Sequence, residues 1–345
     1  MSEPTKPPLQ PPLLALETAT DICSVALITT DGQVREYRTQ GRGVHSSYTF
    51  MYVEDLLRKA NLRVEDLNGV ILSAGPGSYT GLRVGSSAVK GLLHGTEVRL
   101  FAVSTLGAIA LGAALMSASS TASQAALSAR SASGSQATLS AGASAGSLTG
   151  QAPGQPVESI HPKTGPLAGQ CREYAARAHW PVAVAMQVDA VLDARRQHVY
   201  HQPWQVAPEG LQALRPVQVL ALNEVLDRWR DGAVLAGTGL ERLHSLEKKQ
   251  DIVSVKKNCA SLDANYEVIS AAHVLRFLQV IADGGAAAGK DPVEERRAGK
   301  GAAEVGAAEE RRAEETSEGN DYADGSLLRE VHTAEFEPDY YAEIS

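Results

Sequence analysis

The stretch Ser73-Ala-Gly-Pro-Gly-Ser-Tyr-Thr-Gly-Leu-Arg-Val-Gly85 is the most distinctive part of this chain, and the elements around it can be read outward from it. The apolar run Gly69–Leu72 just before it predicts a buried strand. Thr80 is predicted to cap a helix that runs to about His94. Glycine and proline together allow a tight backbone path between the two elements. We assign these residues to the glycine loop: Gly75, Pro76, Gly77, Ser78, Thr80, Gly81 and Arg83.

A glycine-rich turn from a strand into a helix can serve two purposes. It can bind an anion, because free backbone N–H groups lie at the positive end of the helix dipole. It can also be only a sharp turn into a well-packed helix. The lysine and hydroxyl pattern of a P-loop is absent here. We expect the sharp turn and keep the anion site as the alternative.

The elements on either side of this stretch predict the fold class. Three strands, Leu13–Glu17, Ile22–Thr29 and Val34–Thr39, form an antiparallel meander with a turn at Thr30-Asp31-Gly32. A helix of residues 47–60, the strand and helix described above, a strand of residues 99–103 and a helix of residues 105–115 follow. This order predicts an α/β fold of the actin-like ATPase or ribonuclease-H-like class, with mixed sheets, flanking helices and two lobes, the second reduced.

Composition divides the remainder of the chain. Residues 117–179 are dominated by small and polar residues and predict a low-complexity insertion, and residues 284–324 predict a second low-complexity linker. The complete predicted division is a disordered N-terminus at 1–12, the first lobe at 13–116, the insertion at 117–179, a second lobe at 180–283, the linker at 284–324, and a C-terminal segment at 325–345 that packs back on the domain.

Charge and cysteine content exclude several classes of protein. The formal net charge of −8 argues against a protein that binds nucleic acid by itself. The three cysteines lie far apart and form neither a disulfide framework nor a C-x-x-C metal pair, which is typical of the cytoplasm. The proline-rich start has no signal-peptide core, and the apolar run Leu106–Met116 is too short to span a bilayer. We therefore expect a cytoplasmic protein.

Residues with catalytic or metal-binding chemistry are few. His198 and His201 would lie on opposite faces of a strand, so they cannot share a metal. The sequence around Ser78 does not match a nucleophile elbow. Glu17 and Asp193 lie near strand ends, where an actin-like ATPase places carboxylates, but both can equally cap turns. We predict no catalytic residue and no metal ligand.

Two helices carry the pattern of a protein–protein interface. The helix of residues 47–60 is apolar on two sides: Phe50, Val53, Leu57 and Ala60 form one side, and Tyr48, Met51, Tyr52 and Leu56 the other. The helix of residues 81–94 is rich in small residues, which let another helix approach closely. The alternative is that both helices simply pack on one sheet. The predicted partner contacts are Tyr48, Met51, Tyr52, Asp55, Leu56, Gly85, Ser86 and Val89.

Several stretches together resemble one bacterial family, the TsaB (YeaZ) family. They are Leu14-Ala-Leu-Glu-Thr-Ala-Thr20, Cys23-Ser-Val-Ala-Leu27, the glycine stretch of residues 75–85, Lys90-Gly-Leu92, Val103-Ser-Thr-Leu106 and Asp193-Ala-Arg-Arg-Gln-His-Val-Tyr200. The resemblance is dense over residues 13–116, moderate over 182–240 and weak over 330–345. Glu17 departs from it, because many members carry Asp there.

The resemblance implies a function. Members of this family are accessory subunits of the machinery that forms threonylcarbamoyladenosine (t6A) at adenosine 37 of ANN-decoding tRNAs. It implies a non-catalytic scaffold that pairs through its two N-terminal helices with the catalytic subunit TsaD, or with a second copy of itself, and helps recruit the ATPase TsaE. Contact with tRNA would be indirect. No cofactor is expected in this chain, whereas ATP or ADP and a metal ion are expected in the partner subunits. The alternative is a free-standing actin-like ATPase or peptidase.

Overall fold

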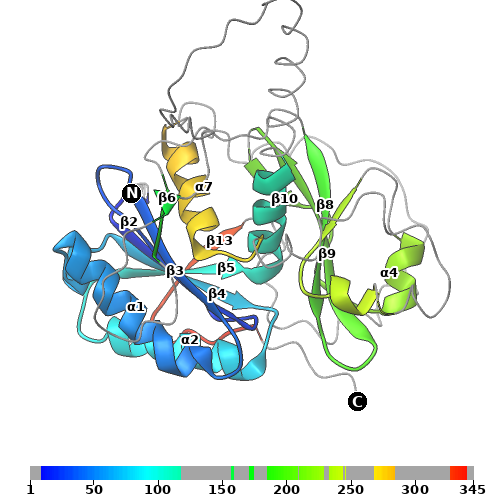
Figure 1. Cartoon of the computed structure of the whole chain (residues 1–345), viewed down its shortest axis with the longest axis horizontal. Coiled ribbons are helices and arrows are strands. Elements are labelled where there is room, and N and C mark those ends of the chain that lie inside the picture. The colour runs from blue at the N-terminus through cyan, green and yellow to red at the C-terminus, as the bar shows by residue number, and fades with distance from the viewer. Residues whose placement is uncertain are drawn as a thin grey trace, which may run out of the picture.

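The structure is a computed structural model, and it describes residues 9–117, 157–158, 171–174, 185–208, 210–228, 233–243, 245, 268–283 and 327–339. Two β-sheets with helices packed on them make up this described part (Figure 1). The fold is the actin-like, ribonuclease-H-like α/β class that the order of elements predicts. In the described part, no helix has both the length and the apolar character needed to cross a bilayer.

The first sheet contains eight strands in the order β13-β5-β4-β1-β2-β3-β7-β6. Strands β1, β2 and β3 form the predicted antiparallel meander, and β4 and β5 extend it as parallel neighbours of β1. The carboxyl ends of β1, β4 and β5 therefore meet at one edge. The bounds are β1 (Leu13–Glu17), β2 (Ile22–Ile28), β3 (Val34–Gln40), β4 (Gly69–Gly75), β5 (Arg99–Ser104), β6 (Val157–Glu158), β7 (Cys171–Tyr174) and β13 (Leu328–Val331).

Helices cover both faces of this sheet (Figure 1). Helices α1 (Val44–Ala60) and α2 (Tyr79–Leu92) share one face and one apolar core, and a short 3-10 turn, Val64–Asp66, leads from α1 towards β4. Helix α7 (Ala271–Asp283) packs on the other face together with a helix of residues 105–117. Strands β1, β2 and β4 are buried along their whole length, so they read as nearly continuous apolar runs rather than as alternating ones.

The helix of residues 105–117 connects the two sheets. Ala108, Leu111 and Leu115 face the first sheet, whereas Leu106, Ile109 and Ala113 pack with Trp204 of the second. Figure 1 shows this helix, in teal, between the sheets. The second sheet has the order β10-β9-β8-β12, with β11 also pairing with β9. Its elements are β8 (Met186–Asp193), β9 (His198–Ala207), β10 (Gly210–Ala213), β11 (Gln218–Ala221), α4 (Leu222–Arg228) and β12 (Val234–Ala236).

The segment predicted as an insertion at 117–179 contributes to the first sheet. Strand β7 pairs with β3 so that Cys171 lies opposite Tyr37, and β6 pairs with β7. The low-complexity composition around β7 hid a four-residue strand whose two end residues are buried and whose two middle residues are half-buried. Most of the predicted insertion, the linker at 284–324 and residues 1–8 of the predicted disordered N-terminus lie outside the described residues.

The C-terminal segment also lies on the first sheet. Strand β13 pairs antiparallel with β5, and Phe336 is buried in the core shared with α1 and α2. The Asp339 N–H then donates to the carbonyl of Ala74 over 2.7 Å. The segment thus runs from the edge of the sheet to the start of the glycine loop.

Candidate functional site

The glycine loop is packed against another part of the chain. The Ala19 carbonyl accepts a hydrogen bond from the N–H of Ser78 over 2.6 Å. A Cβ at Gly77 would meet that same carbonyl, and a Cβ at Gly81 would meet the carbonyl of Thr18. The turn between β1 and β2 therefore lies directly against the start of α2, and the glycines are required by this close approach.

The loop makes a sharp turn from β4 into α2. The side chain of Ser78 caps α2 by accepting from the N–H of Gly81, at 3.4 Å. The predicted cap was Thr80, which instead lies exposed in the first turn. Gly75 has a φ of 134°, and the Asp339 backbone occupies the place of its Cβ. Backbone from the β1–β2 turn and from the C-terminal segment therefore packs closely against the loop at Gly77 and Gly75.

Glu17 holds the turn between β1 and β2. Its carboxyl accepts from the N–H of Ala19 at 2.8 Å and of Thr20 at 3.2 Å, and Ser73 donates to its other oxygen. The side chain is 4% exposed. Burial raises the pKa of Glu17 to about 7, although these hydrogen bonds act in the opposite direction. Glu17 therefore acts as a turn cap, one of its two sequence interpretations.

Asp193 has a similar place in the second sheet. Its carboxylate accepts from the N–H of Arg195 at 2.8 Å and pairs with Arg242 at 2.8 Å. It too caps a turn, at the end of β8. Among the described residues, no group of three or more His, Cys, Asp or Glu side chains is arranged to hold a metal ion.

Most of the predicted partner contacts are buried within this chain, which corrects that prediction. Tyr52, Leu56 and Val89 are completely buried, and Asp55 and Ser86 are 8% exposed. Tyr52 stacks between two other aromatic rings, at 4.8 Å from Tyr37 and 5.5 Å from Tyr48. Gly85 lies against the Thr18 side chain. Of the eight, only Met51, at 38% exposed, and the half-buried Tyr48 remain at the surface.

Asp55 has an internal role. Its carboxylate accepts from the Tyr37 hydroxyl at 2.5 Å, pairs with Lys59 at 3.0 Å and also binds Arg58. Burial opposes the charge, but these three partners hold the pKa of Asp55 below its ordinary value. Asp55 therefore fixes α1 to β3.

The exposed side of the helix pair carries other apolar side chains. Phe50 and Tyr79 are each 54% exposed, and Arg83 donates to the Tyr79 hydroxyl at 3.0 Å with its guanidinium over the ring. The sequence analysis placed Phe50 on one apolar side of its helix, but it included neither Phe50 nor Tyr79 among the predicted partner contacts. Buried positions Thr49, Tyr52, Val53, Leu56 and Leu57 follow helical spacing, and this pattern leaves Phe50 and Met51 outside the core. We call this surface the α1/α2 face: Ser47, Phe50, Met51, Glu54, Arg58, Tyr79, Arg83, Ser87 and Gly91.

Both helices of this face start from the turn that Glu17 holds. His45, at the start of α1, lies 2.8 Å from the Thr20 carbonyl through Nε2, and Ser78 at the start of α2 binds Ala19. From that edge the helices run in the same direction beneath the sheet (Figure 1). The turn therefore positions the first turns of α1 and α2 together.

Part of the chain is similar in sequence to known proteins of tRNA threonylcarbamoyladenosine biosynthesis. Residues 42–145 match the family model described as TsaD, tRNA N6-adenosine threonylcarbamoyltransferase. Over 101 residues the chain is 38% identical to the tRNA threonylcarbamoyladenosine biosynthesis protein TsaB of Escherichia coli K12, covering 29% of this chain and 43% of the relative. The corresponding protein of Bacillus subtilis 168 is 33% identical over 98 residues, which are 28% of this chain and 43% of that protein. The chain is therefore similar in sequence to TsaB proteins over about 100 residues.

Two further comparisons give lower identities. A tRNA N6-adenosine threonylcarbamoyltransferase of Wolbachia pipientis wMel is 30% identical over 114 residues, covering 29% of this chain and 34% of that protein. The solved structure of YeaZ from Pseudomonas aeruginosa aligns with 79% of this chain and 92% of its own, with 21% identity and a TM-score of 0.48. The sequence matches to TsaB proteins thus span less than half of those relatives.

Proposed function

We propose that this chain is a non-catalytic accessory subunit in t6A biosynthesis, acting in the cytoplasm as a scaffold for a TsaD-like catalytic subunit. The exposed apolar group Phe50, Met51 and Tyr79, on the paired helices of a lobe related to TsaB, is the observation that carries the proposal. Large apolar side chains gathered on one surface are typical of a docking site. In this proposal TsaE joins the pair, tRNA is contacted through the complex, and ATP or ADP and a metal ion are bound by the partners.

Charge on the two helices favours a different protein over a second copy of this chain. The α1/α2 face carries two basic residues, Arg58 and Arg83, against one acidic residue, Glu54. Asp55 is itself already paired with Arg58 and Lys59. Symmetric pairing of two such faces would bring an excess of like charge together, whereas a partner with acidic groups around an apolar centre would be attracted. We therefore propose the heterodimer as the working form.

The test is whether a charge on the α1/α2 face prevents assembly. Met51→Glu should weaken binding to the TsaD of the same organism by at least tenfold, because the complex would bury an unpaired carboxylate. Size-exclusion chromatography with light scattering detects the complex. A binding titration of this protein with TsaD, repeated at several salt concentrations, gives the affinity and its dependence on salt. Leu214→Glu is the matched control. Leu214 is an exposed apolar residue of about the size of Met51, 45% exposed, but it lies beside the second sheet, where its N–H donates to the carbonyl of Pro203 on β9.

Three results decide between this proposal and the alternatives. A one-to-one complex that Met51→Glu disrupts and Leu214→Glu preserves supports the scaffold. Undiminished binding by the Met51→Glu variant would show that the α1/α2 face is not the surface that binds TsaD. No complex with TsaD, together with ATP or peptide hydrolysis by the isolated chain that Asp193→Ala abolishes, would establish the free-standing enzyme instead.

A further inference from the structure

A small cavity lies at the carboxyl end of β1, above the turn that carries α1 and α2. Glu17 and Ser73 line it from the ends of β1 and β4, and Thr105 lines it from the start of the helix of residues 105–117. Its other walls are largely apolar and include Ile71, Val103, Ile109, Ile269 and Val274. It leaves about 10 Å³ in which the centre of a water molecule can lie, and a single water needs about 10–15 Å³ by this measure.

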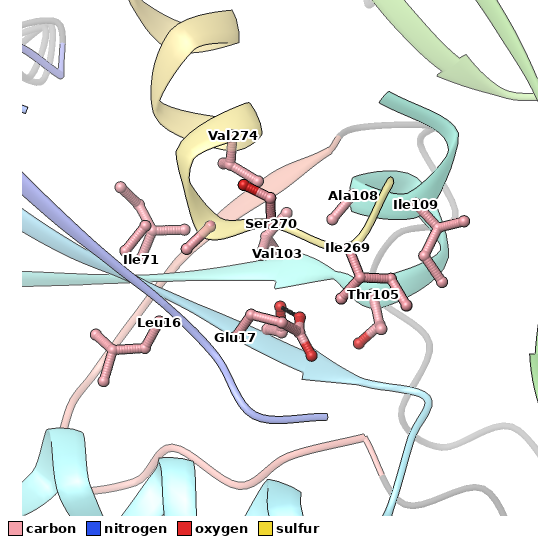
Figure 2. A pocket seen from close by; sticks show the side chains of 13 residues that line it. Leu16, Glu17, Ile71, Val103, Thr105, Ala108, Ile109, Ile269, Ser270 and Val274 are labelled. Carbon is pink, nitrogen blue, oxygen red and sulfur yellow. Dashed lines mark hydrogen bonds between the residues drawn. The ribbon is translucent and has the colours of Figure 1, made fainter. Parts of the chain in front are cut away.

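One polar group on this cavity has no partner among the described groups. The Thr105 side chain is 1% exposed, and its Oγ1 makes no hydrogen bond within the described structure. Figure 2 shows the Thr105 hydroxyl turned towards the side of the cavity on which the Glu17 carboxyl lies. A buried hydroxyl without a partner loses the hydrogen bonds that it makes to water in the unfolded chain, so native structures nearly always satisfy such a group. The N-terminal capping at this helix is done by its neighbour Ser104, which accepts from the N–H of Gly107 at 3.2 Å.

We infer that this cavity binds one water molecule, held by the Thr105 hydroxyl, the Glu17 carboxyl and the Ser73 hydroxyl. Three polar groups are within the two to four that a buried water needs. Ser270, just before α7, also lines the cavity. Its hydroxyl donates to Glu36 at 2.7 Å, so that proton is already used. The water therefore connects β1 and β4 with the helix that lies between the two sheets. This inference is independent of the proposed function.

Water suits both protonation states of Glu17. Burial raises the pKa of Glu17 to about 7, so both forms are populated near neutral pH. Among the described residues that line the cavity, none is a lysine, arginine or histidine that would neutralise the carboxylate. A water molecule donates to the carboxylate and accepts from the protonated acid, whereas a fixed donor or acceptor satisfies only one of the two.

The test removes the Thr105 hydroxyl while keeping its shape. With the water in place, Thr105→Val breaks a satisfied network and should lower the midpoint of chemical denaturation. Without a water, the same change removes an unsatisfied buried hydroxyl and should raise the midpoint or leave it unchanged. Thr105→Ser is the matched variant, because it keeps the hydroxyl and should keep the water.

High-resolution crystal structures of the unmutated protein and the two variants give the direct readout. We expect a density peak within hydrogen-bond distance of Thr105 Oγ1 and Glu17 in the unmutated protein and in Thr105→Ser, and its loss in Thr105→Val. An unmutated structure without this peak overturns the inference even if a variant fails to fold. A peak that strengthens in crystals grown with rubidium salt would show that the site binds a cation and would overturn the inference. Unchanged or raised stability of Thr105→Val would overturn it as well.

Discussion

Glu17 shows how one buried carboxyl can organise a surface far from itself. Its oxygens bind the backbone N–H groups of Ala19 and Thr20, and the carbonyls of the same turn contact the starts of α1 and α2. A carboxyl in this place remains in the interior because its hydrogen bonds offset part of the cost of burial. At the residue scale, Glu17 is therefore a positioning residue for the α1/α2 face.

Stability should depend on the protonation of Glu17. The folded protein raises its pKa from 4.5 to about 7, so the folded state binds this proton more tightly than the unfolded chain does. The stabilisation is complete below pH 4.5 and is lost as the pH rises to about 7, in total by roughly 3 kcal/mol. Glu17→Gln stays neutral, so its stability relative to the unmutated protein should increase from pH 5 to pH 8.

Urea denaturation at a series of pH values measures this difference. Cys23 is the titratable neighbour of Glu17, and burial raises its pKa to about 11, so it does not titrate in this range. Parallel pH profiles for the two proteins would show that Glu17 does not carry the proton.

Helix α2 illustrates, at the scale of an element, that identical residue types have different roles along one helix. A Cβ at Gly81 would collide with the Thr18 backbone, while a Cβ at Gly91 meets nothing within 4 Å. Both positions lie in α2, and Gly91 is exposed. The first glycine is needed for packing, and the second only lowers helix propensity.

Alanine at these two positions should change stability in opposite directions. Gly81→Ala should destabilise by about 1–3 kcal/mol or more, because the β1–β2 turn must move away from α2. Gly91→Ala should stabilise by about 0.5–1 kcal/mol through helix propensity. Guanidinium denaturation of both variants checks this pair, and a stabilising Gly81→Ala would contradict the packing account.

At the scale of the whole molecule, a buried polar cluster joins segments that are distant in sequence. Glu36 on β3 accepts from Ser24 at 2.5 Å, from Ser270 at 2.7 Å and from Tyr174 at 2.7 Å, and is completely buried. The N–H of Ala271, at the start of α7, donates to the Ser24 hydroxyl at 2.9 Å. This cluster attaches β7 and α7 to the meander.

Removing one member should loosen α7. Ser270→Ala deletes a hydrogen bond to a buried carboxyl and should cost about 1.5–3 kcal/mol. Amide hydrogen exchange should accelerate in α7 more than in α1 or α2. Ser87→Ala, on the exposed side of α2, is the control and should leave exchange unchanged; equal acceleration everywhere would show that the cluster has no local role.

Local sequence patterns predicted the order of elements, the meander, the glycine turn and the likeness of the first lobe to TsaB proteins, because apolar periodicity and turn residues act locally. Tertiary structure alone decided that Tyr52, Leu56 and Val89 face the core while Phe50 and Tyr79 face outward. A helix that is apolar on two sides does not indicate which side the sheet will cover. The tertiary structure also showed that Cys171–Tyr174 joins the first sheet and that Asp339 lies against Gly75. Contacts between residues so far apart in sequence depend on the packing of the whole chain, so local sequence patterns do not predict them.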